Sequence, residues 1–202
     1  MSRSAFRPSP IFLGLLGVWI TGGLMAWYEF GNPTVDTLLF VLGGWLVSLS
    51  LHEFSHALFA YRAGDRFVAQ RGYLTLNPLK YTHPLLSIGL PLLFLLLGGI
   101  GLPGGAVWVD RSAIRGRLRN SLISLAGPAA NVVFLIVLVV PFVAGADTGA
   151  HPTFWAAVAF FAFLQLTAAV LNLLPVPGLD GGNALRPWLK DSAAKLDRKS
   201  VV

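Results

Sequence analysis

Long apolar runs separated by short basic clusters dominate the pattern of hydrophobic and polar positions along this chain. Five stretches contain no Asp, Glu, Lys or Arg apart from one glutamate, namely 8–28, 37–61, 81–109, 120–146 and 148–179. A helix that crosses a membrane needs about 20 mostly apolar residues. Four of these stretches form complete spans, so the pattern predicts an all-α polytopic membrane protein with four full transmembrane helices.

The basic residues predict how these helices are threaded through the membrane. All fifteen Lys and Arg residues fall into four clusters, at 3–7, 62–80, 111–119 and 186–199. Basic residues mark the cytoplasmic loops of membrane proteins. With all four clusters in the cytoplasm, residues 8–61 and 120–185 each form a pair of spans with an outer turn. Both termini are then cytoplasmic.

The remaining run, 81–110, has basic residues at both flanks. A single crossing would place one of the flanking clusters outside, and two crossings need about 40 residues plus a turn. The run is also rich in glycine and proline. Irregular backbone is tolerated at membrane depth only where protein or a watery cavity satisfies its polar groups. We therefore expect a re-entrant or broken hydrophobic segment, with a fifth full span as the alternative.

Residues 66–76 place β-branched and aromatic residues near a period of two, which predicts a short cytoplasmic strand or β-hairpin. The sequence contains no internal repeat or low-complexity linker. Residues 1–190 are accordingly interpreted as one transmembrane domain, and 191–202 as a charged C-terminal tail.

Composition refines this interpretation. Hydrophobic residues make up 55% of the 202 residues and charged residues 12%, about half the charged fraction of soluble domains. The net charge of +6 is explained by cytoplasmic loops, and since aromatic and basic residues do not interleave we expect no nucleic-acid partner. The absence of cysteine excludes disulfides, thiolate metal sites and cysteine nucleophiles.

The second predicted span contains His52-Glu53-Phe54-Ser55-His56. Residues four apart lie on one face of a helix, so both imidazoles can bind a single zinc ion. Glu53 lies beside the first histidine, where it can act as a general base. An ionised carboxylate near mid-membrane costs at least about 2.5–3.5 kcal/mol, which indicates a function for Glu53. The alternative is a satisfied polar cluster between helices.

A catalytic zinc site has three protein ligands and one open position. The other two histidines, His83 and His151, lie in predicted loops and are better explained as ordinary loop residues. Asp180 is the stronger candidate, because it follows the last apolar run among prolines and glycines that break a helix. The alternative is a simple turn aspartate at a helix end.

Depth in the membrane supports this choice. His52 lies ten residues before Arg62, which is about 15 Å along a helix. Asp180 lies six residues before Arg186, and the last span runs towards the same side. We therefore predict that His52, His56 and Asp180 bind one Zn²⁺.

These motifs resemble those of the site-2 protease family of intramembrane metalloproteases. His52-Glu53-x-x-His56 is followed by Asn172-x-x-Pro175-x-x-x-x-Asp180-Gly181. The stretches Gly127-Pro128-Ala129-Ala130-Asn131 and 72–79 agree with bacterial members, and the resemblance covers about residues 36–190. Two departures are His83 before Pro84, where an acidic residue is expected, and a less proline-rich end to the segment 81–110.

The resemblance implies roles as well as a fold. It implies that His52, His56 and Asp180 bind zinc and that Glu53 is the general base. It implies that Asn172 donates to the oxyanion, and that Asn131 helps to hold the substrate or the oxyanion. The expected function is hydrolysis of peptide bonds within or near transmembrane segments of membrane-protein substrates, during regulated intramembrane proteolysis in a bacterial plasma membrane.

Two other classes of function stay open. One is a catalytically inactive membrane chaperone or scaffold that keeps the motif for packing. The other is a metal-binding membrane protein or zinc transporter, which is less favoured because the ionisable groups gather at one depth rather than along a path.

Overall fold

The computed structural model describes residues 6–81 and 109–189. Four long helices fill most of these ranges: α1 (Pro10–Tyr28), α2 (Pro33–Ala63), α5 (Arg117–Val143) and α6 (Pro152–Leu173). Each is long and apolar enough to cross a membrane. The four predicted spans are confirmed, and the protein is an integral membrane protein. The predicted re-entrant segment, His83 and the tail 191–202 lie outside the described residues.

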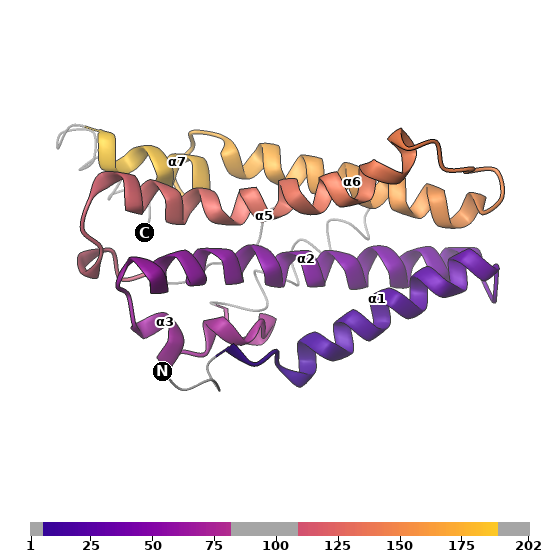
Figure 1. The fold of residues 1–202 in the computed structure, drawn as a ribbon, viewed down its shortest axis with the longest axis horizontal. Coiled ribbons are helices and arrows are strands. Elements are labelled where there is room, and N and C mark those ends of the chain that lie inside the picture. Colours follow the sequence, from indigo (N-terminus) through magenta and orange to yellow (C-terminus); the bar gives the residue numbers. More distant parts are fainter. Residues whose placement is uncertain (1–5, 82–108, 190–202) are drawn as a thin grey trace.

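The helices form a bundle around α2. In Figure 1, α1 crosses one side of α2, and α5 and α6 lie on the other. The α1–α2 and α5–α6 turns lie at one end of the bundle, and the short elements lie towards the opposite end (Figure 1). The positions of the basic clusters predicted that these two turns would lie at the same end. That the opposite end, which carries the basic residues, is cytoplasmic stays a prediction.

The long helices begin at sequence signals that are local. Three of them start with proline in the first turn, at Pro10, Pro33 and Pro152, where the missing N–H costs no helical hydrogen bond. The Ser9 Oγ accepts a hydrogen bond from the Phe12 N–H at 3.1 Å. The Asn32 Oδ1 accepts from the Thr34 N–H at 2.9 Å. These caps satisfy backbone donors that the helix itself leaves unpaired.

Small residues let α1 approach α2 closely. A Cβ built on Gly22 would lie 2.5 Å from the Phe40 backbone nitrogen, and one on Gly43 would lie 2.9 Å from the Trp19 nitrogen. Lipid tails are as apolar as the helix surfaces, so the hydrophobic effect does not drive helices together in a membrane. They associate instead through close van der Waals packing, which small residues allow. Trp19 then packs against Phe134 and Phe161, with ring centroids 5.4 and 6.3 Å away, which joins α1 to α5 and α6.

The predicted strand or β-hairpin at 66–76 is wrong. This stretch folds as α3 (Phe67–Gln70) and the 3₁₀ helix η2 (Tyr73–Thr75), and η3 (Pro78–Lys80) follows. The Asp65 Oδ1 accepts a hydrogen bond from the Phe67 N–H at 2.9 Å, which favours a helical turn. A strand also needs a partner for its backbone groups, and no strand occurs in residues 6–81 or 109–189. The apolar residues pack against α2 from helical turns instead.

Candidate metal centre

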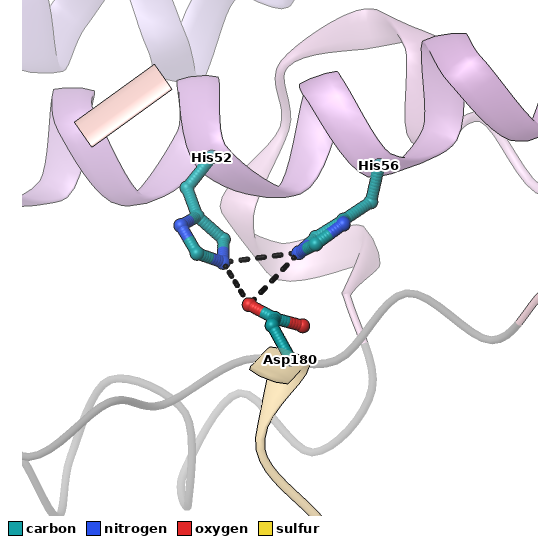
Figure 2. Close-up of side chains that lie close together, drawn as sticks. All are labelled: His52, His56 and Asp180. Atoms are coloured by element: carbon teal, nitrogen blue, oxygen red, sulfur yellow. Dashed lines mark hydrogen bonds and ion pairs between the residues drawn. The ribbon is translucent and has the colours of Figure 1, made fainter. Parts of the chain in front are cut away.

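The predicted metal ligands meet where α2, α5 and the short helix α7 (Asp180–Leu185) come together. His52 and His56 project from α2, and Asp180 reaches them from the first residue of α7 (Figure 2). The His52 Nε2 lies 3.2 Å from the Asp180 Oδ2, and the His56 Nε2 lies 3.3 Å from the same oxygen. The two Nε2 atoms are 3.1 Å apart.

This triangle fits a zinc ion. Zinc in proteins is tetrahedral, with bonds to nitrogen and oxygen of about 2.0–2.2 Å, so two of its ligand atoms lie about 3.3 Å apart. The three observed separations match that edge. Two imidazole nitrogens and one carboxylate oxygen are also a donor set that catalytic zinc sites use. In the part of the chain that the structure describes, this is the group of His and acidic residues able to hold a metal.

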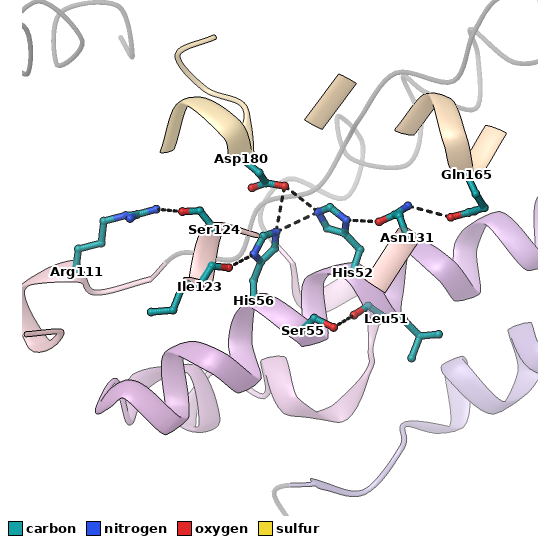
Figure 3. Close-up of polar contacts among 10 residues, drawn as sticks. All are labelled: Leu51, His52, Ser55, His56, Arg111, Ile123, Ser124, Asn131, Gln165 and Asp180. Atoms are coloured by element: carbon teal, nitrogen blue, oxygen red, sulfur yellow. Dashed lines mark hydrogen bonds and ion pairs between the residues drawn. The ribbon is translucent and has the colours of Figure 1, made fainter. Parts of the chain in front are cut away.

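Hydrogen bonds orient both imidazoles for this task (Figure 3). The His56 Nδ1 donates to the Ile123 backbone carbonyl at 2.7 Å, and the His52 Nδ1 donates to the Asn131 Oδ1. Because a carbonyl oxygen can only accept, each Nδ1 carries the proton and each Nε2 keeps its lone pair. Metal-binding histidines in proteins are held by this kind of second hydrogen bond.

Gly127 forms the wall of the site on α5. A Cβ at this position would lie 2.5 Å from the His52 Nε2 and closer still to the His56 Nε2. Any side chain there would therefore intrude on the ligand atoms. The Gly127-Pro128 stretch, noted in the sequence as a motif, thus lets α5 lie directly against the two histidines.

The break in the chain after α6 brings Asp180 to the histidines. α6 ends at Leu173, and residues 174–179 are not helical. A Cβ on Gly181 would lie 2.5 Å from the Leu174 carbonyl oxygen, so the start of α7 folds back tightly against this connection.

The other predicted site residues are buried nearby. Glu53 follows His52 on α2, and 2% of its surface is exposed. Asn172 lies in the last turn of α6 and is also buried. Asn131 instead contacts a metal-ligand candidate directly.

Three neighbours of the site were not predicted from the sequence. Gln165 on α6 accepts a hydrogen bond from the Asn131 Nδ2 at 3.0 Å (Figure 3). The Arg111 Nη2 donates to the Ser124 Oγ at 3.0 Å. The Tyr81 hydroxyl donates to the Ser50 carbonyl at 3.1 Å, and burial together with the Glu53 charge raises the pKa of this phenol. These residues lie far from the His52–His56 motif in the sequence, so the motif could not point to them. Gln165 alone offers a signal, because a glutamine inside an apolar span is unusual.

His151 does not join the site, as the sequence predicted. It precedes α6 at the opposite end of the bundle, where its Nδ1 donates to the Trp27 carbonyl at 2.8 Å. Its ring stacks on the Trp27 ring at a centroid distance of 3.7 Å.

Comparison with known proteins agrees with this geometry. The chain is 53% identical over 191 residues to the "Putative zinc metalloprotease Rip2" of Mycolicibacterium smegmatis, covering 93% of this chain and 73% of that protein. It is 54% identical over 194 residues to the protein of the same name from Mycobacterium tuberculosis, with the same coverage. The chain belongs to the site-2 protease family of zinc metalloproteases.

A more distant relative of this site-2 protease carries a similar name. The "Putative zinc metalloprotease YwhC" of Bacillus subtilis is 34% identical over 146 residues, which is 67% of this chain and 63% of that protein. No protein-family model and no solved structure matches the chain. The site-2 protease is thus a metalloprotease enzyme with zinc as its cofactor, and the His52–His56–Asp180 group is suited to hold the ion.

Proposed function

We propose that this site-2 protease hydrolyses peptide bonds within or near transmembrane segments, using one zinc ion held by His52, His56 and Asp180. The observation that carries the proposal is the triangle of ligand atoms 3.1–3.3 Å apart. The two histidines of the triangle lie inside α2, a helix able to span a membrane. A peptide bond must therefore come to the site from within the bilayer or from its edge.

Glu53 is the general base in this proposal. A zinc ion at the site would acidify the attacking water and polarise the scissile carbonyl. Glu53 takes a proton from that water and later delivers it to the leaving amine. Its position next to His52 and its near-complete burial support this role, because desolvation strengthens charge interactions at the reacting atoms.

Asn172 is proposed as the donor to the oxyanion. Its burial and its position in the last turn of α6, just before the connection that leads to Asp180, support this role. One such donor contributes about 2.7–4 kcal/mol to the transition state. Asn131 stays a candidate for holding the substrate, although both its Oδ1 and its Nδ2 already bond protein groups.

The substrate class follows from the location of the site. A transmembrane helix hides its carbonyls in hydrogen bonds, so local unwinding must precede attack. Substrates with helix-breaking residues near the cleaved bond are therefore favoured. We further propose that cleavage is on the cytoplasmic side of a bacterial plasma membrane, as part of regulated intramembrane proteolysis, with both termini of this chain cytoplasmic.

Glu53→Gln tests the function. The variant keeps the shape of the side chain and all three ligands, so we expect zinc content equal to wild type but loss of cleavage of a transmembrane peptide in proteoliposomes. Glu29→Gln, the same chemical change at the α1–α2 turn, is the matched control and should cleave normally. Wild-type cleavage by Glu53→Gln would show that Glu53 is not the general base. A wild type that binds zinc but cleaves no peptide would favour the scaffold or metal-carrier alternative.

A further inference from the structure

A chain of buried hydrogen bonds leads away from the metal centre through three helices. From the His52 Nδ1 it passes to the Asn131 Oδ1 on α5, and the Asn131 Nδ2 donates to the Gln165 Oε1 on α6 at 3.0 Å. The Gln165 Nε2 donates to the Ser48 Oγ at 2.8 Å, and this hydroxyl donates to the Trp45 carbonyl at 3.0 Å. The chain therefore begins and ends on α2, and Figure 3 shows its first part.

The last hydrogen bond, from Ser48 to Trp45, determines which group donates and which accepts in every other bond of this series. The Trp45 backbone carbonyl can only accept, so it takes the Ser48 hydroxyl proton and leaves the Ser48 oxygen as an acceptor. The Gln165 amide must then present its NH₂ to Ser48 and its oxygen to Asn131. Asn131 in turn presents its oxygen to His52. The proton of His52 is thereby fixed on Nδ1, and the lone pair on Nε2.

We propose that Gln165, together with Ser48, is a positioning residue that sets the tautomer of His52 and so prepares its Nε2 for zinc. The proposal rests on the proposed function, in which that Nε2 is a zinc ligand. Neither Gln165 nor Ser48 touches the ligand atoms, and they act through Asn131. A ligand that is already in the right tautomer binds without first moving a proton, which raises metal affinity.

Burial makes the direction of the chain stable. Gln165 is 0% exposed and Ser48 3%, so water does not offer either amide or hydroxyl another partner. Reversing the Asn131 amide alone would place its NH₂ against the Nδ1–H and its oxygen against the Gln165 oxygen. Unpaired buried polar groups of this kind cost about 1–3 kcal/mol each. If these hydrogen bonds only held the helices together, their donors and acceptors could be exchanged without consequence. Orienting His52 requires the direction described here.

The test compares two substitutions of Gln165 that differ in what they present to Asn131. Gln165→Leu removes the acceptor and frees Asn131 to reverse. Gln165→Glu keeps an oxygen towards Asn131, whether or not the carboxyl is protonated. Thr167→Val is the control, since the Thr167 hydroxyl bonds only its own helix, at the Phe163 carbonyl. Full-length protein in detergent would be titrated with zinc against a competing chelator. Metal-free protein labelled with ¹⁵N-histidine would report the tautomer by NMR, with His52→Ala assigning the signal.

We expect Gln165→Leu to weaken zinc binding by about two- to tenfold, because the apparent affinity falls in proportion to the fraction of His52 in the competent tautomer. Its His52 signal should change to a mixture of tautomers. Gln165→Glu and Thr167→Val should match wild type in both measurements. Wild-type zinc affinity and an unchanged His52 signal in Gln165→Leu would overturn the proposal. Equal loss in both Gln165 variants with an unchanged tautomer would also overturn it, because that result describes cohesion alone.

A second variant covers the case in which Gln165→Leu does not fold. Ser48→Ala removes only the far end of the chain, and it should produce the same shift of the His52 signal with a smaller loss of zinc affinity. No shift in Ser48→Ala would contradict the direction argued here. If wild type binds no zinc at all, the proposed function fails, while the tautomer signal of the metal-free protein still decides whether Gln165 orients His52.

Discussion

Replacing Gly127 by alanine should close the metal site from the α5 side. The added methyl group would lie 2.5 Å from the His52 Nε2 and nearer to the His56 Nε2. Non-bonded heavy atoms prefer about 3.5–4.0 Å, so at least one imidazole must retreat by about 1 Å. Metal-site distances hold to about 0.2 Å, so this retreat removes a ligand from its working position.

The size of the effect follows from overpacking. An extra methyl group in a well-packed interior costs about 1–3 kcal/mol. If that cost falls on the zinc-bound state, zinc affinity drops by about 5- to 150-fold, since about 1.4 kcal/mol is a factor of ten. Peptide cleavage should fall at least as far. The change is best measured by zinc competition with a chromophoric chelator, followed by cleavage at saturating and at limiting zinc.

Gly17→Ala is the matched control for this experiment. Gly17 also lies inside a membrane-spanning helix, but a Cβ there meets nothing within 4 Å among residues 6–81 and 109–189. The control should bind zinc normally. Wild-type zinc affinity in Gly127→Ala would refute the reasoning, because it would mean that the ligand atoms do not lie against α5 as described.

Two further predictions concern how α7 and the metal support each other. Ser121→Ala should weaken zinc binding and lower Tm. The Ser121 Oγ donates to the Ala184 carbonyl of α7 at 2.6 Å and accepts from the Trp188 Nε1, in the 3₁₀ helix η6 (Arg186–Trp188) that follows α7, at 2.8 Å, so it holds both elements on α5. Unchanged zinc affinity and Tm would show that α7 is fixed by other contacts. Removing zinc with a chelator should lower the stability of wild type by about 2.7 kcal/mol relative to zinc at a hundred times its Kd. The same treatment should not change the Tm of Asp180→Ala, and a chelator shift that survives in that variant would point to a different metal site.

Local sequence determined the spans and half of the site. Helix length and apolar content are properties of contiguous residues, so α1, α2, α5 and α6 could be predicted with their turns. The four-residue spacing of His52 and His56 likewise fixes one helical face, whatever the rest of the chain does. The short stretch at 66–76 failed because a period of two over a few residues is weak, and because pairing and burial decide its backbone.

Tertiary structure decided what the distant residues do. The sequence could name Asp180 as a candidate, but only the fold of α7 against α5 and α6 brings its carboxylate within 3.3 Å of both histidines. The resemblance implied that Asn131 helps to hold the substrate or the oxyanion, which stays a prediction; only the structure shows that its oxygen bonds His52. Gln165 stands out as a polar residue in an apolar span, but its partners could not be predicted from the sequence. A hydrogen bond between helices depends on their packing and rotation, and these are set by all their contacts together rather than by any local pattern.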